Sequence, residues 1–197
     1  MIEIYYGKSN ASDIENKESQ LVEFFKQKVN KYNDYNSRIV RINAYYELQN
    51  ILIKKKIPLV FTINSYGKIY LNNNNLYFNL SHSNDYYAFA ISKEEVGIDI
   101  EKVRDDVNIN LIKRISNSKD EIKDVIKMWT IKESYLKYLG TGINTNFKDI
   151  LINKNSVSRN GEMLASYYNF KIANELNIYE ITLCAKTIGK IKIIEIK

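Results

Sequence analysis

The amino-acid sequence predicts an α+β protein made of two similar lobes, each an antiparallel sheet packed against helices. Two observations indicate this fold class. Helical patterns followed by runs of short strands occur twice along the 197 residues, and a strand with two acidic residues lies between the two runs, near residue 100. We expect the lobes at residues 1–98 and 99–197, as a pseudo-dimer that works as one unit with its ligand site at the junction.

The first lobe is expected to contain one strand, two helices and a series of hairpins. The strand covers residues 2–6, and a capping box at residues 12–15 opens a helix whose apolar stripe runs to Tyr32. A second helix covers residues 37–54 and ends before Pro58. Extended segments with turn residues between them then follow at residues 59–63, 68–71, 76–80 and 86–92.

Residues 96–101 (VGIDIE) are expected to form a short strand with two carboxylates on one face. Because residues i and i+2 of a strand point the same way, Ile98 and Ile100 can enter a core while Asp99 and Glu101 share the other side. Two ionised groups about 6 to 7 Å apart repel each other by about 2 to 3 kcal/mol at an effective dielectric constant near 20. Two interpretations follow: an exposed strand end with solvated acids, or a site for a hard cation such as Mg²⁺ or Mn²⁺, which prefers oxygen ligands.

The second lobe opens with charged, irregular sequence that includes a short helix at residues 108–114. A capping box at residues 118–121 predicts a long helix that continues to Leu139 and ends at residues 140–142 (GTG). The remaining chain is expected to be extended, with turns between four segments at residues 147–152, 167–172, 179–185 and 190–196.

An acidic residue, Glu133, falls within the apolar stripe of the long helix. It lies about 40° from Trp129 around the helix axis, so it faces the packed side. Lys137 follows one turn later. Glu133 therefore either forms a marginal i,i+4 salt bridge with Lys137, worth about 0.3 to 0.5 kcal/mol, or meets Asp99 and Glu101 as a third ligand or a general base.

Composition limits the setting and the partners of the protein. The net charge of +6 favours a polyanionic partner, and we expect no nucleic acid because neither an aromatic RNA-binding signature nor a regular basic helix is present. Cys184 is the single cysteine, which excludes an internal disulfide. No apolar run reaches the length of a membrane span, and residues 1–5 read as a strand and not as a signal peptide, so we expect a cytoplasmic protein without a membrane partner.

Four motifs in the middle of the chain occur in a specific order. They cover roughly residues 60–145, at positions 66–68 (YGK), 78–83 (FNLSHS), 96–102 (VGIDIEK) and 129–143 (WTIKESYLK with GTGI). In these motifs and their gaps the sequence resembles the Sfp-type 4'-phosphopantetheinyl transferases. The resemblance implies the fold of that family and transfer of the 4'-phosphopantetheine arm of coenzyme A to a serine of an apo acyl or peptidyl carrier protein. It also implies release of 3',5'-ADP, a need for Mg²⁺ with Mn²⁺ as a substitute, and a monomer.

The resemblance also assigns roles to residues. It implies that Asp99, Glu101 and Glu133 bind the metal, that Glu133 takes the proton of the attacking serine, and that Lys137 contacts the pyrophosphate. Further contacts to coenzyme A are implied for Lys28, Lys31, Arg41, Lys68, Ser81 and His82, the first three at phosphate, Lys68 near the nucleotide, and Ser81 and His82 at the 3'-phosphate.

The sequence departs from the family pattern at three places, and the last of them lies in a region that helps to hold the carrier protein in that family. Ile69 stands where proline is usual, residues 114–116 (RIS) stand where an aromatic pair is common, and the segment between Glu121 and Trp129 is short. The carrier would serve fatty-acid, polyketide or peptide synthesis. The alternative function is a non-catalytic coenzyme A or nucleotide-binding domain that has lost carrier-protein docking.

Overall fold

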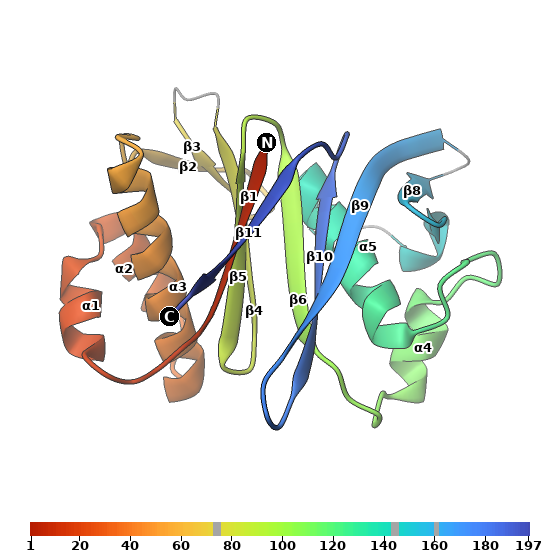
Figure 1. The fold of residues 1–197 in the computed structure, drawn as a ribbon, viewed down its shortest axis with the longest axis horizontal. Coiled ribbons are helices and arrows are strands. Elements are labelled where there is room, and N and C mark those ends of the chain that lie inside the picture. The colour runs from red at the N-terminus through yellow and green to blue at the C-terminus, as the bar shows by residue number, and fades with distance from the viewer. Residues whose placement is uncertain (73–75, 143–145, 160–161) are drawn as a thin grey trace.

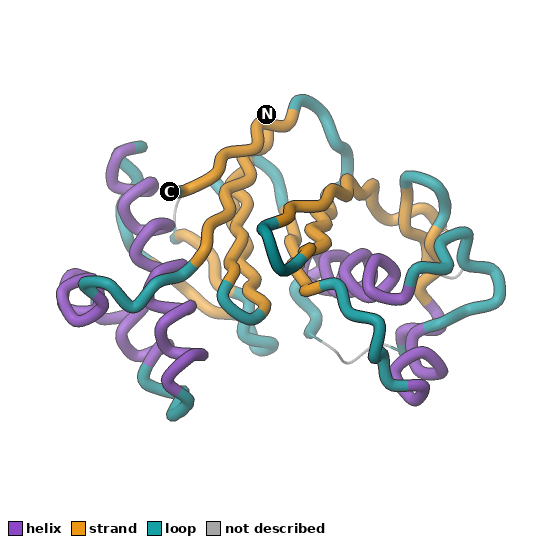
Figure 2. Tube along the Cα trace, turned by 60° about the horizontal axis from the view of Figure 1, so that its bottom comes forward, coloured by secondary structure: helices purple, strands orange, loops and turns teal. Residues whose placement is uncertain are grey.

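The computed structural model describes residues 1–72, 76–142, 146–159 and 162–197. In this part of the chain, sheets pack against helices, as the sequence predicts (Figure 1). Most helices lie on the outer sides of the molecule and the strands lie between them (Figure 2). The fold class is therefore α+β.

The first sheet has four strands in the order β11-β1-β5-β4. The bounds of these strands are β1 (Ile2–Lys8), β4 (Tyr77–Ser83), β5 (Tyr86–Ser92) and β11 (Ile191–Ile196). Beside this sheet lie the hairpin of β2 (Phe61–Ile63) and β3 (Ile69–Leu71), and three helices, α1 (Ile14–Gln20), α2 (Glu23–Val29) and α3 (Tyr35–Lys54). Phe25, Leu48 and Phe89 are fully buried between the helices and the sheet.

The single helix predicted to run from residue 12 to Tyr32 is wrong, because the chain forms two helices there. Leu21 and Val22 adopt extended backbone angles between α1 and α2. The side chain of Gln49 on α3 pairs with backbone groups on both sides of this break. It accepts a hydrogen bond from the Val22 amide at 2.8 Å and donates one to the Gln20 carbonyl at 2.9 Å. The predicted capping box does not form, and α1 begins after Asp13 without a side-chain cap.

The second sheet has five strands in the order β6-β10-β9-β8-β7. Its strands are β6 (Val96–Lys102), β7 (Ile150–Ile152), β8 (Ser156–Arg159), β9 (Glu162–Ala173) and β10 (Ile178–Ala185), and it is accompanied by α4 (Ile109–Ile115), α5 (Val125–Leu139) and the 3₁₀ turn η1 (Phe147–Asp149). The predicted start of the long helix at residue 118 is wrong, because α5 begins at Val125 with Asp124 as its N-cap. Asp120 instead accepts from the Ile152 amide and from the buried ammonium of Lys132.

A core between the two sheets holds them face to face. It contains Ile4 and Ala90 from the first sheet and Ile98, Ile100 and Ile181 from the second, all fully buried. The other face of β6 is covered by α5, so β6 is buried on both sides between the core and the helix.

Alternate side chains of β4 fasten this strand to β6. Asn79 accepts a hydrogen bond from the Ile98 amide at 2.9 Å, and Ser83 accepts one from the Lys102 amide at 3.2 Å. Ser81, between them, donates to the Asp99 carboxylate at 2.8 Å. The polar positions of the FNLSHS motif thus give β6 partners at the edge where its own sheet ends.

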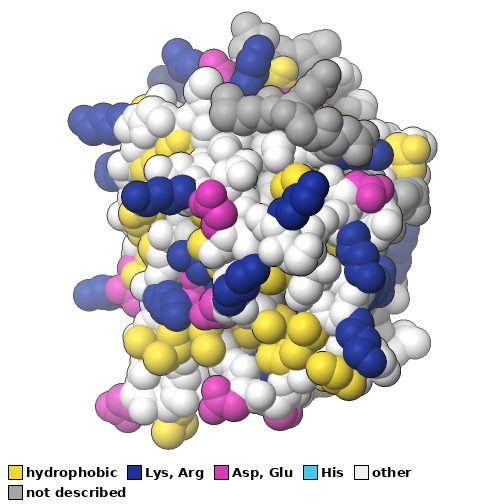
Figure 3. All heavy atoms as spheres, turned by 90° about the vertical axis from the view of Figure 1, so that its right-hand side faces the viewer, with side chains coloured by type: hydrophobic (Ala, Val, Ile, Leu, Met, Phe, Trp, Pro, Cys, Tyr) yellow, Lys and Arg dark blue, Asp and Glu magenta, His cyan; other side chains and the backbone are white. Residues whose placement is uncertain are grey.

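The surface formed by the second sheet and its helices carries basic and hydrophobic side chains side by side. Lysine and arginine together outnumber the acids by 29 to 23 in the whole chain. Figure 3 shows that on this face the basic side chains are spread over the surface, with hydrophobic side chains between them. No helix among the described residues has the length and apolar character that crossing a membrane requires.

Candidate active site

Strand β6 supplies the two acidic side chains of the site. Ile98 and Ile100 enter the core between the sheets, so the alternation of the strand turns Asp99 and Glu101 toward α5. Asp99 is only 3% exposed, whereas Glu101, at the end of the strand, is half-buried. The arrangement excludes the interpretation that both acids are solvated at an exposed strand end.

Helix α5 brings Glu133 and Lys137 over these acids. The close approach depends on Gly97, because a Cβ atom at this position would overlap the Ser134 carbonyl oxygen and the Tyr138 amide nitrogen of the helix. The backbone of α5 therefore rests directly on β6. Glu133 and Lys137, one turn apart, face the same cavity as Asp99.

A compact network links Lys137 to the acidic strand. Its ammonium group donates to Asp99 Oδ1 at 2.6 Å and to Ser81 Oγ at 2.8 Å. Next to it, Ser83 Oγ donates to Glu101 Oε2 at 2.8 Å. The marginal i,i+4 salt bridge considered for Lys137 and Glu133 is replaced by an ion pair between Lys137 and the strand acid Asp99.

The environment of the acids opposes their ionised forms. Burial raises the pKa of Glu133 to about 7, with the charge of Asp99 as the second cause and the charge of Lys137 acting in the opposite direction. Burial and the same Asp99 charge also raise the pKa of Glu101. The three acids together carry more negative charge, when ionised, than the single ammonium group of Lys137 can neutralise.

Two buried carboxylate oxygens of the site have no hydrogen-bond partner, namely Asp99 Oδ2 and Glu133 Oε1. Such oxygens are costly to bury unless a cation or a donor reaches them. In the described part of the chain, no group of three or more His, Cys, Asp or Glu side chains lies close enough together to hold a metal ion in their present conformations. The donor set of unpartnered carboxylate oxygens nevertheless fits a hard divalent cation in chemical character.

The acids open into a cavity of about 350 Å³, which we call the acid cavity. Its lining comes from β4, β6, α3, α5 and the segment between α2 and α3. It consists of Tyr32, Arg41, Tyr45, Leu80, Ser81, His82, Asp99, Glu101, Trp129, Glu133 and Lys137. The cavity therefore joins carboxylates on one side to cationic and aromatic side chains on the other. An anionic ligand and a cation could be held there together.

His82 and Arg41 form the basic side of the acid cavity. The Arg41 guanidinium group lies 3.5 Å from the centre of the Tyr32 ring and donates to the Ser37 carbonyl, which fixes its plane. Burial, with the nearby charges of Arg41 and Lys137, lowers the pKa of His82 to about 4. The imidazole is therefore neutral at pH 7.

Three other lysines that the sequence singled out lie apart from the acids. The side chain of Lys68 is 6% exposed, and its ammonium group donates to Glu95 at 2.6 Å and to the Tyr138 carbonyl at 2.9 Å. It lines a smaller neighbouring cavity. Lys28, which lies 5.7 Å from the ring centre of Phe24, and the exposed Lys31 line neither cavity.

Sequence reasoning missed the aromatic residues of the site. Tyr32 was assigned to an apolar helix stripe, yet it follows the end of α2, is 40% exposed and stacks on Arg41. Trp129 stacks on Phe147 with ring centres 5.3 Å apart and also lines the acid cavity. The only signal for Trp129 was its place at the head of the WTIKES motif. No sequence signal distinguished Tyr32.

Comparison with known proteins points to one family. The model of the 4'-phosphopantetheinyl transferase superfamily matches residues 95–184. The 4'-phosphopantetheinyl transferase gsp of Aneurinibacillus migulanus is 30% identical over 140 residues, which are 60% of this chain and 58% of that protein. The 4'-phosphopantetheinyl transferase Sfp of Bacillus subtilis (strain 168) is 30% identical over 101 residues, 45% of each protein.

The matches with these curated relatives span about half of the relatives' length. The family model covers β6 and α5, the two elements that carry all three acids and the lysine of the site. In this region the chain is similar to the 4'-phosphopantetheinyl transferase superfamily, and its resemblance to the Sfp-type 4'-phosphopantetheinyl transferases is confirmed.

Proposed function

We propose that this protein transfers the 4'-phosphopantetheine arm of coenzyme A to a serine of an apo carrier protein and releases 3',5'-ADP. The observation that carries the proposal is the acid cavity. It combines three carboxylates and a lysine from β6 and α5 with cationic and aromatic side chains from the first half of the chain. A diphosphate ester needs its negative charge neutralised on both sides of the reacting phosphorus, and this composition suits that need.

Asp99, Glu101 and Glu133 are the residues that would hold Mg²⁺, or Mn²⁺ in its place. The unpartnered oxygens of Asp99 and Glu133 support this assignment. When bound, the cation would neutralise the diphosphate and polarise the phosphorus that the serine attacks.

The side chains around the acids have separate tasks in the proposed reaction. Lys137, with 28% of its side chain exposed, can turn from Asp99 to the diphosphate and stabilise the leaving phosphate. Glu133, with a pKa of about 7, can accept the proton of the attacking serine near neutral pH. Ser81, His82 and Arg41 line the same cavity and would bind the 3'-phosphate of coenzyme A.

Among the basic residues of the first helices, we assign phosphate binding to Arg41 in preference to Lys28 and Lys31. Arg41 lines the acid cavity and is held by Tyr32, whereas neither lysine lines it. Lys68 we place near the nucleotide through the smaller cavity that it lines. Its ammonium group already has three acceptors, so its main contribution is to hold the β2–β3 hairpin against α5.

We further propose that the protein acts as a cytoplasmic monomer whose two similar lobes, residues 1–98 and 99–197, form a pseudo-dimer with the site between them. Both halves of the chain line the acid cavity, with Arg41 and His82 from the first and Asp99 and Glu133 from the second, which supports a site between the lobes. Acidic carrier proteins would be attracted by the net charge of +6.

The test is a transfer assay with apo carrier proteins, coenzyme A and Mg²⁺. The wild type should add the mass of the phosphopantetheine arm to one serine. Asp99→Asn should lower the rate by at least 10²-fold because the metal site and the partner of Lys137 are both weakened. Asp149→Asn, at an exposed acid on η1, is the control and should keep the wild-type rate. Absence of both transfer to a broad carrier panel and coenzyme A binding would contradict the proposal.

A second candidate function is a coenzyme A or nucleotide-binding domain without transfer activity. It is favoured by the segment before α5, where the chain from Asn117 to Asp120 is held by hydrogen bonds of Asp120 in place of a helical extension. In that case the wild type would bind coenzyme A, the binding would depend on Asp99, and no carrier protein would be modified. The same assay distinguishes the two functions.

A further inference from the structure

Strands β4 and β6 lie side by side although they belong to different sheets. β4 is the last strand of the first sheet and β6 is the first strand of the second. Side chains at every second position of β4, Asn79, Ser81 and Ser83, reach across to β6. The two serines have the same spacing as the acids Asp99 and Glu101, so one hydroxyl group meets each carboxylate.

Each hydroxyl group holds one oxygen of its carboxylate and leaves the other. A serine has a single proton to donate. Ser81 donates its proton to Asp99 Oδ1 at 2.8 Å, and Asp99 Oδ2 is buried without a hydrogen-bond partner. Ser83 donates to Glu101 Oε2 at 2.8 Å, which leaves Glu101 Oε1 for another partner. The acid cavity is therefore lined by two strand carboxylates whose orientation is fixed and whose second oxygens remain to bind a ligand.

Ser83 is itself held in place. Its oxygen accepts from the Lys102 amide at 3.2 Å while its proton goes to Glu101, and the residue is only 8% exposed. Turning the hydroxyl group to another acceptor would break a buried hydrogen bond. Glu101, in contrast, is half-buried near the end of β6, and a long side chain there has rotamers that lead to solvent. The contact with Ser83 selects the rotamer in which Glu101 lines the acid cavity.

The two strand acids differ in how much they depend on their serine. Asp99 Oδ1 also accepts from Lys137 at 2.6 Å, so this carboxylate keeps a donor if the hydroxyl group of Ser81 is lost. Among the described residues, Ser83 supplies the single hydrogen bond that the side chain of Glu101 accepts. The orientation of Glu101 therefore depends on Ser83.

Resting on the proposed function, we propose that Ser83 is a positioning residue for the divalent cation. Its hydroxyl group orients the Glu101 carboxylate so that Oε1 can serve as a ligand together with Asp99 Oδ2. Ser83 acts through Glu101 and not on the cation itself, since Glu101 lines the acid cavity and Ser83 does not. Loss of a partner that orients a metal ligand lowers metal affinity by about 10- to 100-fold.

Binding of Mn²⁺ to the free protein tests the inference. Trp129 is the single tryptophan of the chain and lines the acid cavity, so quenching of its fluorescence by the paramagnetic ion reports binding there. Ser83→Ala should bind Mn²⁺ more weakly than the wild type, by about tenfold or more. Ser83→Thr keeps a hydroxyl group on the same carbon atom and should stay within about threefold of the wild-type affinity.

A double-mutant cycle determines whether Ser83 acts through Glu101. Glu101→Ala removes the ligand and should itself weaken Mn²⁺ binding. If Ser83 works by orienting Glu101, adding Ser83→Ala to Glu101→Ala should change the affinity by less than about twofold. A loss as large as that in the wild-type background would mean that Ser83 supports the site in another way, and would overturn the inference.

Ser92→Ala on β5 is the matched control. Ser92 is 6% exposed and accepts from the Glu94 amide at 3.1 Å, but it does not line the acid cavity. This variant should bind Mn²⁺ as the wild type does, and melting temperatures without Mn²⁺ should show that both alanine variants fold. Equal losses of Mn²⁺ affinity in Ser83→Ala and Ser92→Ala, or no loss in Ser83→Ala, would refute the role of Ser83.

These results are separate from the fate of the proposed function, which the transfer assay decides. Transfer by the wild type together with unchanged Mn²⁺ affinity in Ser83→Ala refutes only the role of Ser83. Binding of Mn²⁺ that depends on Ser83, without transfer or coenzyme A binding, refutes only the proposed function. A wild type to which Mn²⁺ does not bind refutes the cation site and the inference with it.

Discussion

Glu133 shows how one residue carries both a cost in stability and a capacity for chemistry. It is 8% exposed, one of its oxygens has no partner, and burial beside Asp99 raises its pKa to about 7. A group whose pKa is raised on folding binds more protons in the folded state than in the unfolded one. The free energy of unfolding must therefore fall as the pH rises from about 4.5 to 7.

The residue-scale prediction is that Glu133→Gln removes this part of the pH dependence. Without divalent cations, the variant should be more stable than the wild type by about 2 to 3 kcal/mol at pH 8, and nearly equal to it at pH 4. Urea unfolding at both pH values measures the difference. If Mg²⁺ binds at Glu133, its addition should stabilise the wild type at pH 8 more than the variant. A variant that is less stable at pH 8 would contradict the electrostatic account.

The acids and the lysine of the site could be predicted from the sequence because their positions follow from local periodicity. The i, i+2 relation of Asp99 and Glu101 and the stripe position of Glu133 depend only on strand and helix geometry. Arg41 could not be distinguished from Lys28 and Lys31 in this way. What selects Arg41 is the stacking of its guanidinium group on Tyr32, a contact between α3 and the turn before it.

At the scale of elements, the contact of α5 with β6 sets the distance between Glu133 and the strand acids. Gly97→Ala should force the helix away from the strand, because the added methyl group meets backbone atoms that cannot rotate aside. We expect a loss of about 1 to 3 kcal/mol in unfolding free energy and a marked loss of coenzyme A affinity or transfer. Gly189→Ala is the control, since nothing lies within 4 Å of its added Cβ. Wild-type stability and activity of Gly97→Ala would show that the contact is looser than described.

The buried pair of Lys132 and Asp120 fixes the other side of α5. The Lys132 ammonium group is completely buried and donates to Asp120 at 3.0 Å and to the carbonyls of Ile115 and Phe147. These contacts join α5 to the end of α4, to the segment before α5 and to η1. Removal of the ammonium group leaves the buried Asp120 carboxylate without its counter-ion.

We therefore expect Lys132→Met to cost about 3 to 5 kcal/mol in thermal or urea unfolding. Lys127→Met, on the same helix but without an ion pair, should change stability by less than about 0.5 kcal/mol. Equal effects of the two substitutions would mean that the buried pair is not a structural anchor.

The same pair explains why the boundaries of elements were harder to predict than their existence. Ser118 to Glu121 has the pattern of a capping box, but Asp120 is used by the Ile152 amide and by Lys132, which lie far away in sequence. Gln49 likewise ends α1 from a distance. Local sequence signals cannot include such partners, whereas the strands and helices themselves follow from periodicity that the chain carries locally.

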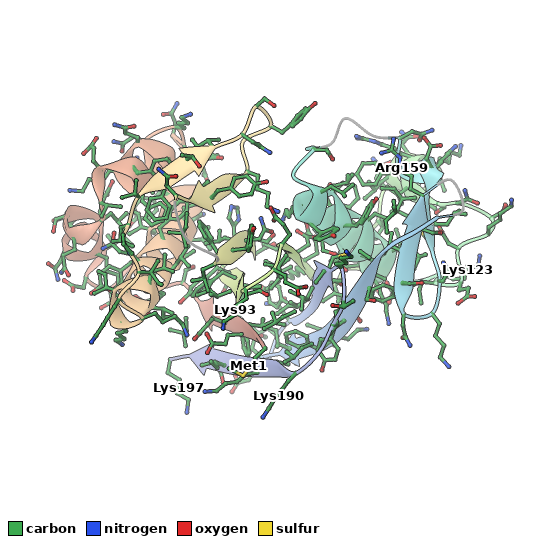
Figure 4. The ribbon with its side chains drawn as sticks, turned by 90° about the horizontal axis from the view of Figure 1, so that it is seen from above. Met1, Lys93, Lys123, Arg159, Lys190 and Lys197 are labelled. Atoms are coloured by element: carbon green, nitrogen blue, oxygen red, sulfur yellow. The ribbon has the colours of Figure 1, made fainter. Side chains whose placement is uncertain are left out.

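At the scale of the whole molecule, the two ends of the chain bind the two sheets into one structure. β11 runs parallel to β1, with Ile2 opposite Ile191 and Gly7 opposite Ile196, so the last strand returns from the second sheet to the first. In Figure 4, Met1 and Lys190 lie next to each other at the start of this pair. The division expected between residues 98 and 99 falls inside β6, whose Ile98 and Ile100 complete the core between the sheets.

This connectivity predicts that residues 1–98 and 99–197 do not fold as separate fragments. The first would lack β11 and half of β6, exposing the outer edge of β1 and the apolar face on which Ile4 and Ala90 lie. The whole chain should unfold in urea in a single transition at which circular dichroism and tyrosine fluorescence coincide. Each fragment alone should lack a cooperative transition. A cooperative transition in the fragment 1–98 would show that the first sheet and its helices are stable without β11, and that the core between the sheets contributes little to holding the site together.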